Sequence, residues 1–261
     1  MPVVEHAGTA VHYEVAGAGF PLVLLHGLSL TGASWGLAGY LDELTRRYRC
    51  ITVDARGAGG SGKPHVPASH TLELYVGDVL AVLDHEQVGE FAVWGFSRGG
   101  AVGIALAAGC PGRVRCLVLT GAYDLSPCTL EDIEEQQGIV AKTRAGGMPA
   151  MLADWEPGED PPLPDWFRDT ILEYDPHAWV AARYAGWSWP EVSGDRIAAR
   201  TLVIVGSGED PGNDAARWTA GLVDGHSTTV PDRTHCGAFL ATSDCLAAAL
   251  PFLKGVVGGT D

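Results

Sequence analysis

Basic residues are few in this chain: fourteen Arg and three Lys stand against 32 acidic residues among 261, giving a formal net charge of −15. They are scattered singly or in pairs. Because phosphate binding needs clustered Lys and Arg, we expect no nucleic acid and no anionic membrane as a partner. Charged residues of both signs make up only 19% and apolar residues 46%, a composition that supports an ordered core and excludes a disordered chain.

Long apolar runs are also lacking. No stretch approaches the roughly 20 consecutive apolar residues of a membrane-spanning helix. Residues 1–6 show no basic stretch followed by an apolar run, so no signal peptide is expected. The six cysteines form no C-x-x-C pair, which argues against a zinc site and a disulfide framework. We therefore expect a cytoplasmic protein with buried free thiols and no bound metal.

Strand-length apolar runs alternate with helix-length amphipathic stretches over most of the chain. This alternation predicts a single α/β domain: an eight-stranded, mostly parallel sheet with helices on both faces. The first two strands are separated by a short turn and suit an antiparallel hairpin at the edge. The expected strands are Val3–His6, Val11–Ala16, Pro21–Leu25, Cys50–Val53, Phe91–Gly95, Val114–Thr120, Thr201–Val205 and Ser227–Val230. The expected helices are Ser34–Tyr48, Leu72–Gln87, Ser97–Gly109, Asp214–Asp224 and Phe239–Lys254.

Residues 121–195 break the alternation. This region holds eight of the sixteen prolines, five of the eight tryptophans, and fifteen acidic against four basic residues, a net of −11. Helices are expected at Leu130–Arg144, Asp165–Tyr174 and Pro176–Trp187. A Trp-rich insertion must bury its apolar face, and the carboxyl edge of the sheet is the nearest surface. We therefore expect a core of residues 1–120 and 196–261 and a helical lid of residues 121–195.

The strongest local motif is G-x-S-x-G at residues 95–99, between an apolar strand and a helix. The glycines allow a strained strand-to-helix turn that projects the Ser97 hydroxyl above the sheet. The helix amino terminus directs its N–H groups and positive dipole at the same point. Ser97 is therefore the predicted nucleophile.

A serine hydroxyl is a weak nucleophile until a base removes its proton. His235 follows the last expected strand and so belongs at the carboxyl edge of the sheet, near Ser97. The rival His226 precedes that strand and belongs at the opposite edge. The sequence therefore predicts His235 as the base.

An acid must orient the histidine, and three candidates are open. Asp210 lies in the loop after strand Thr201–Val205, and the following Pro211 favours a fixed, extended backbone there. Asp210 is therefore preferred. Glu209 stands beside it on the same loop, and Asp124 follows strand Val114–Thr120.

The oxyanion of a tetrahedral intermediate needs backbone N–H donors. Gly27 allows the loop after strand Pro21–Leu25 to fold close over the site, so the N–H of Leu28 can join that of Arg98 as an oxyanion pair. His26 is interpreted as a structural residue that hydrogen-bonds loop backbone.

Together these residues resemble the α/β-hydrolase superfamily, in particular its lidded, single-domain branch of esterases and lactonases. The resemblance rests on the segments 24–27, 54–61 and 95–100 and on the chain order of nucleophile, acid and histidine. It runs from about residue 11 to 253, with no motif matched in the lid. It implies that Asp54 and Arg56 fix the geometry of a glycine-rich loop and have no catalytic role. It also implies that Ser97, where epoxide hydrolases and haloalkane dehalogenases have Asp, excludes those two activities.

Two residues depart from the family pattern. Arg98 stands where many relatives have Met, Gln or Leu, and its guanidinium suits either a structural salt bridge or substrate binding, the first being preferred. Thr234 stands where Gly is usual and should restrict the loop that carries the histidine.

The lid tryptophans have two interpretations. Packing of the lid on the sheet accounts for most of them, whereas an aromatic ceiling over Ser97 would suit a flat, apolar substrate. The candidate pocket walls are Phe96, Tyr123, Trp179, Trp187 and Trp189.

The function predicted is hydrolysis of a neutral, apolar carboxylic ester or lactone through an acyl-enzyme, without metal or organic cofactor. Carbon–carbon bond hydrolysis and cofactor-free perhydrolysis use the same triad and stay open. A hypothesis of another class is a protein of this fold that binds a small ligand without turnover. The acidic lid disfavours CoA, phosphoester and carboxylate substrates. A monomer or a homodimer is expected.

Overall fold

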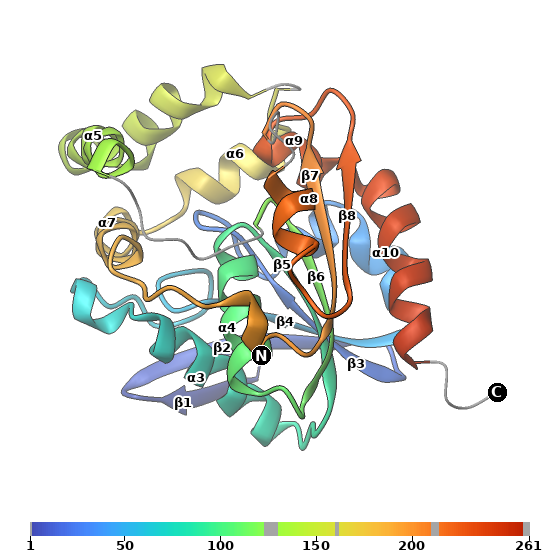
Figure 1. The fold of residues 1–261 in the computed structure, drawn as a ribbon. Coiled ribbons are helices and arrows are strands. Elements are labelled where there is room, and N and C mark those ends of the chain that lie inside the picture. The colour runs from blue at the N-terminus through green and yellow to red at the C-terminus, as the bar shows by residue number, and fades with distance from the viewer. Residues whose placement is uncertain (1, 123–129, 160–161, 210–213, 258–261) are drawn as a thin grey trace.

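The computed structural model describes residues 2–122, 130–159, 162–209 and 214–257. Eight strands form one sheet in the order β1-β2-β4-β3-β5-β6-β7-β8 (Figure 1). β2 pairs antiparallel with β1 and β4, and all other neighbours are parallel, which confirms the predicted sheet. The strands are β1 (Val3–His6), β2 (Thr9–Ala16), β3 (Phe20–Leu25), β4 (Tyr48–Val53), β5 (Phe91–Phe96), β6 (Val114–Thr120), β7 (Arg200–Gly206) and β8 (Gly225–Val230).

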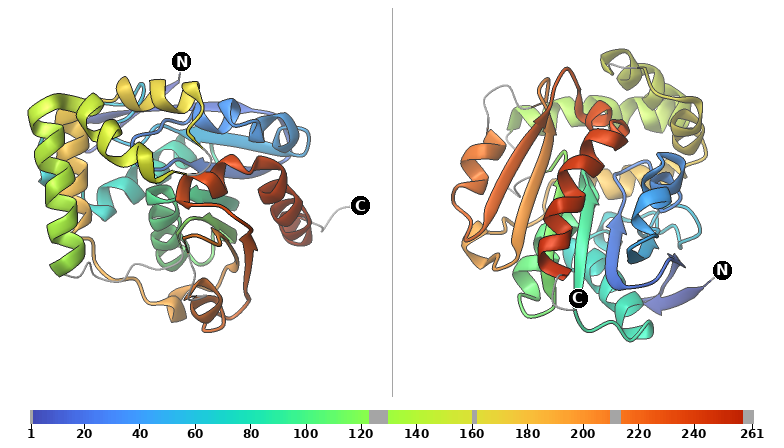
Figure 2. Two further views of the ribbon diagram at one scale, coloured as in Figure 1. Left: turned by 90° about the horizontal axis from the view of Figure 1, so that it is seen from above. Right: turned by 90° about the vertical axis from the view of Figure 1, so that its right-hand side faces the viewer.

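Side chains of the central strands alternate between two buried clusters, one on each face of the sheet. In β3, Leu22 and Leu24 belong to one cluster and Val23 to the other, as the pleat of a strand requires. The cluster with Leu22 includes residues of helices α2 (Tyr40–Leu44) and α10 (Thr242–Val257). The cluster with Val23 includes residues of three other helices. These are α3 (Leu72–His85), α4 (Arg98–Gly109) and α8 (Asp214–Thr219). Helices therefore cover both faces, and α10 is seen lying across the sheet in Figure 2.

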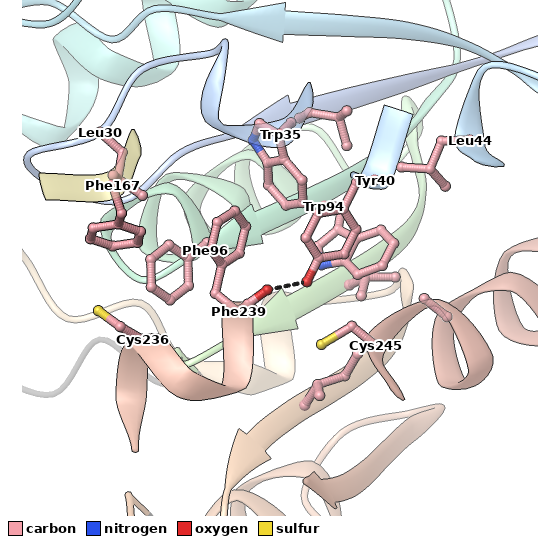
Figure 3. Packing of buried hydrophobic residues seen from close by; sticks show 14 of the residues in the cluster. Leu30, Trp35, Tyr40, Leu44, Trp94, Phe96, Phe167, Cys236, Phe239 and Cys245 are labelled. Carbon is pink, nitrogen blue, oxygen red and sulfur yellow. Dashed lines mark hydrogen bonds between the residues drawn. The ribbon is translucent and has the colours of Figure 1, made fainter. Parts of the chain in front are cut away.

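Aromatic rings connect the first cluster to the helix that carries His235, which is α9 (His235–Leu240). The ring of Phe96 stacks on that of Phe239, with centroids 4.5 Å apart. The Tyr40 hydroxyl donates a 2.6 Å hydrogen bond to the Phe239 carbonyl (Figure 3). Trp35 packs edge-on against both Tyr40 and Phe239. The last turn of α9 is thus held in the core.

Between β6 and β7 the described chain is helical. Figure 1 shows α5, α6 and α7 to one side of the sheet, apart from the helices that cover its faces. The elements of this segment are α5 (Leu130–Trp155), η2 (Glu156–Gly158), α6 (Asp165–Leu172), α7 (Pro176–Gly186) and η3 (Gly194–Arg196). Helix α5 extends beyond its predicted end at Arg144. It consists of two helical parts that meet at a kink at Gly147, whose φ of 68° is not helical.

Two predicted helices are each divided in two. The stretch Ser34–Tyr48 forms α1 (Ser34–Leu37) and α2, separated at Gly39, whose φ of 87° cannot continue a helix. The helix expected from Phe239 begins at His235 as α9, ends at Leu240 and is followed by α10.

Four described cysteines are buried and one is half-buried, all as free thiols. Burial raises the pKa of the Cys50 and Cys116 thiols to about 12, which makes them poor nucleophiles. Cys128 lies outside the described residues. Within the described ranges, no helix is both long and apolar enough to cross a membrane, and no three His, Cys, Asp or Glu residues gather as a metal site would require.

Candidate active site

Ser97 occupies the turn between β5 and α4. Its backbone has φ of 51° and ψ of −118°, a conformation that is strained for a residue with a side chain. The turn holds because its N–H donates to the Thr120 carbonyl at 2.9 Å. A β-carbon at Gly99 would lie 2.1 Å from the Leu25 carbonyl oxygen, so only glycine lets α4 approach β3 this closely. The predicted strand–turn–helix context of Ser97 is present.

His235 is the first residue of α9, just after the loop that follows β8. Its Nδ1 lies 2.5 Å from Oε1 of Glu209, in the loop after β7. Since a carboxylate only accepts, Nδ1 carries the proton in this pair. The Nε2 atom is then the one with a lone pair available for a serine hydroxyl.

The structure brings Glu209 to the histidine. Asp210, the acid preferred from the sequence, lies outside the described residues, as does Asp124. The second carboxylate oxygen of Glu209 is buried and has no hydrogen-bond partner within the described ranges. Within the described ranges, the hydrogen bond of the Glu209 carboxylate is the one to His235.

Gly121, directly after β6, gives the histidine its space. Its φ is 60°, and a β-carbon there would lie 2.8 Å from the His235 ring and 3.3 Å from Oε1 of Glu209. No motif in the sequence marks this glycine. Its position after a strand at the carboxyl edge was the available signal.

The loop after β3 approaches Ser97 from the other side. A β-carbon at Gly27 would lie 2.8 Å from the Phe96 ring and 3.4 Å from Cβ of Ser97. His26 fixes this loop: its Nδ1 donates to the Gly27 carbonyl at 2.7 Å, and its Nε2 accepts the Ala55 N–H at 3.0 Å. Burial lowers the pKa of His26, so the ring is neutral. Its predicted structural role is confirmed.

Ser97 and His235 line the same pocket, which has a volume of about 180 Å³. Of the predicted wall residues, Phe96 and Trp179 line it, and Tyr123 lies outside the described residues. The other lining residues are Leu28, Ser29, Ile139, Met151, Trp155, Phe167, Arg183 and Cys236. Helices α5, α6 and α7 supply six of the twelve, so the segment between β6 and β7 forms one side of the pocket.

A sequence model of the α/β hydrolase fold matches residues 21–198, about two thirds of the chain. The chain belongs to the α/β-hydrolase family. It is 35% identical over 123 residues to the 2-hydroxymuconate semialdehyde hydrolase of Pseudomonas sp. (strain CF600), covering 46% of this chain and 42% of that protein. The chain spans about half the length of the curated relatives it matches.

Solved structures share the fold over nearly the whole chain. A thermophilic esterase from Thermogutta terrifontis superposes with a TM-score of 0.85 at 23% identity, over 98% of both chains. The enol-lactonase from Burkholderia xenovorans LB400 gives a TM-score of 0.84 at 22% identity, over 97% of this chain and 100% of that one. At these identities the likeness establishes the fold.

Two predicted wall residues of this α/β hydrolase are not among the residues that line the pocket. Trp187 packs edge-on against Tyr184, and Trp189 donates from Nε1 to the His70 carbonyl at 3.0 Å. Both come after α7 ends at Gly186, where the chain has left the pocket. Trp155, at the end of α5, lines it instead.

Among the described residues, the side chain of Arg98 does not form the salt bridge preferred from the sequence. Its Nη1 donates to the Ala182 carbonyl of α7 at 3.0 Å, and its guanidinium lies 4.9 Å from the Trp189 ring centroid. No described carboxylate forms a salt bridge with it, and it is not among the residues that line the pocket beside Ser97. The expected salt bridge is replaced by a link to α7, a segment 84 residues away.

The glycine-rich loop after β4 has the structural role that the resemblance implied. Asp54 accepts the N–H groups of Gly32 at 2.7 Å and Gly60 at 2.8 Å. Arg56 is buried and paired through two nitrogens with Asp78. These carboxylates hold the loops around the site in place.

Proposed function

We propose that this protein is a serine hydrolase that cleaves a carboxylic ester or lactone through an acyl-enzyme. The observation that carries the proposal is the strained Ser97 at the strand–helix turn, in one pocket with a histidine whose Nδ1 is already paired with a carboxylate. Strain of this kind persists where the surrounding fold enforces it, and it is concentrated at functional sites.

In the proposed reaction, Nε2 of His235 takes the Ser97 hydroxyl proton as Oγ attacks the substrate carbonyl carbon. The carbonyl oxygen becomes an oxyanion, bound by the backbone N–H groups of Leu28 and Arg98. The leaving alcohol takes the proton from His235, and Ser97 remains acylated. Water, deprotonated by His235, then attacks the acyl carbon. The bond from that carbon to Oγ of Ser97 breaks, the acid leaves, and His235 returns the proton to Oγ.

We assign the orienting acid to Glu209. Its bond to Nδ1 fixes the tautomer that leaves Nε2 basic, and its charge stabilises the imidazolium formed during attack. Asp210, preferred on sequence grounds, and Asp124 remain alternatives that mutagenesis separates.

Residues 121–195 are proposed to act as a lid over the core of residues 1–120 and 196–261. The support is that α5, α6 and α7 line the pocket with five apolar residues and Arg183; the apolar ones are Ile139, Met151, Trp155, Phe167 and Trp179. This apolar lining supports an apolar acyl group, and the net charge of −11 on the segment supports a neutral substrate.

Carbon–carbon bond hydrolysis is the second candidate. It is favoured by the 35% identity to 2-hydroxymuconate semialdehyde hydrolase, which covers 46% of this chain. Parallel assays with p-nitrophenyl butyrate and a vinylogous β-diketone distinguish the two reactions.

The test is hydrolysis of p-nitrophenyl butyrate by the purified chain and by Ser97→Ala. Wild type should turn over with a burst of p-nitrophenol, and Ser97→Ala should lose the burst and nearly all turnover. Full turnover by Ser97→Ala would remove Ser97 from the mechanism. An intact protein without any turnover would favour the non-catalytic ligand-binding hypothesis.

A further inference from the structure

A hydrogen bond joins helix α7 to the loop after β3. The indole Nε1 of Trp179 donates to Oγ of Ser29 at 2.7 Å, across 150 positions of sequence. Both side chains line the pocket and are buried, with exposed fractions of 3% for Trp179 and 7% for Ser29. A buried, short hydrogen bond between segments so far apart fixes their relative position.

Ser29 has a strained backbone conformation, which the hydrogen bond to Trp179 can stabilise. Its φ is 72°, in the left-handed region that favours glycine. It is the third residue of a turn closed by the Leu30 N–H and the Gly27 carbonyl at 3.2 Å, a position where a left-handed residue is usually Gly or Asn. Without the hydrogen bond from Trp179, Ser29 would relax to a negative φ, and the conformation of the turn would change.

The turn carries one half of the proposed oxyanion hole. Leu28 precedes Ser29, and its other neighbour, Gly27, is held by the His26 ring. Leu28 thus lies between one residue fixed by the core and one residue fixed by α7. The direction of the Leu28 N–H depends on both.

The other half of the hole is tied to the same helix. Arg98, whose backbone N–H is the second proposed donor, binds the Ala182 carbonyl through its side chain. Asp175 caps α7 by accepting the N–H groups of His177 at 2.8 Å and Ala178 at 2.9 Å, so the helix begins at Pro176, three residues before Trp179. Helix α7 therefore contacts both segments that supply the proposed oxyanion donors, the loop after β3 and the start of α4.

We propose that Trp179 is a positioning residue of the oxyanion hole: its indole N–H holds Ser29 in the left-handed conformation and so keeps the Leu28 N–H directed at the reacting carbonyl. This rests on the proposed hydrolase function. It makes catalysis dependent on the docking of α7, since the hole is complete only when the indole reaches Ser29.

The test uses the full chain and p-nitrophenyl butyrate. Trp179→Phe retains the ring and removes the N–H, and Ser29→Ala removes the acceptor. Each should lower kcat roughly tenfold to hundredfold, less than the loss of a whole oxyanion donor, with KM changing little. The double variant should lose no more than either single one, because both remove the same bond. Trp218→Phe on α8 is the matched indole control and should keep wild-type kcat.

A rescue separates positioning from packing. Glycine adopts a positive φ without strain, so Ser29→Gly added to Trp179→Phe should restore most of the lost kcat. Additive losses in the double variant, a rise in KM alone, or no recovery with glycine would overturn the proposal. All assays run well below each variant's Tm, since a lost buried hydrogen bond costs about 1 kcal/mol.

A readout without turnover separates failure of this inference from failure of the proposed function. In ¹⁵N NMR spectra, Trp179→Phe should shift the amide resonances of Leu28 and Ser29, and Trp218→Phe should leave them in place. Unshifted Leu28 and Ser29 resonances would overturn the positioning role whether or not the wild type hydrolyses esters.

Discussion

Nδ1 of His235 lies 2.5 Å from Oε1 of Glu209, a carboxylate 26 residues earlier in the chain. This pair sets the tautomer of the histidine, and Gly121 leaves the space in which the two side chains meet. The loops after β6, β7 and β8 converge at this point, because neighbouring parallel strands end at the same edge of the sheet.

Replacing Glu209 by Gln should lower kcat by about 10⁴-fold, because the amide favours the wrong histidine tautomer and cannot stabilise the imidazolium. Asp210→Asn is the matched control on the adjacent residue. If Glu209 is the orienting acid, this substitution should change kcat less than threefold. Steady-state hydrolysis of p-nitrophenyl butyrate measures both. The reverse order of effects would return the acid to Asp210.

Gly121→Ala should abolish most activity, because its β-carbon would lie 2.8 Å from the His235 ring and φ is 60°. Displacing a catalytic ring by about 1 Å costs on the order of 10²-fold in rate. Gly138→Ala in α5 is the control, since nothing lies within 4 Å of its β-carbon, and it should leave kcat unchanged. Equal kcat for wild type and Gly121→Ala would show that the ring has room to move.

Stability should rise with pH between about 4 and 6.5 through His70. Burial lowers the pKa of this ring to about 4, from an unfolded value of 6.5. In that pH window the unfolded chain binds more protons at this site than the folded chain does. The free energy of unfolding therefore increases with pH, and the contribution of His70 is lost on acidification. The neutral ring accepts the Tyr75 hydroxyl at 2.9 Å and donates to the Pro64 carbonyl at 2.8 Å.

Urea unfolding at pH 4.5 and 6.5 measures this effect. His70→Gln should be less stable than wild type at pH 6.5 and should show a smaller difference between the two pH values. An identical pH dependence in the variant and the wild type would mean that His70 is not the titrating group.

Neutral substrates should be preferred over anionic ones. The proposed lid, residues 121–195, carries a net charge of −11, whereas Arg183 adds one positive charge to the pocket lining. We expect kcat/KM for p-nitrophenyl butyrate to exceed that for p-nitrophenyl succinate by roughly tenfold, a difference that shrinks with salt. Arg183→Met should widen the difference. A preference for the succinate ester that Arg183→Met removes would reverse this expectation.

Local pattern was enough to predict the sheet and the places of Ser97 and His235 at its carboxyl edge. Each prediction depends on a strand, on the turn that ends the strand and on the edge of the sheet where that turn lies. All three follow from a short stretch of consecutive residues. Glu209 and Asp210 could not be separated in this way. They share one short loop without regular periodicity, so which side chain turns toward the histidine depends on Gly121 and on the end of β8.

The pocket residues between β6 and β7 were hardest to predict for a related reason. Trp179 and Trp189 belong to the same Trp-rich stretch, yet only the first is on α7, which faces the pocket. The hydrogen-bond partner of the Arg98 side chain was equally difficult to predict. It is a backbone carbonyl 84 residues away, and side-chain composition does not indicate which carbonyl lies nearby. Contacts between the insertion and the core depend on how the helices dock, and periodicity within each helix leaves that docking open.

The central claim is that Ser97 is the nucleophile of an acyl-transfer site. The most direct measurement is intact and peptide mass spectrometry after incubation with a fluorophosphonate. Wild type should gain one phosphonyl group on the peptide that contains Ser97, and Ser97→Ala should gain none. A wild-type protein that hydrolyses esters but is unlabelled, or is labelled at another residue, would contradict the account.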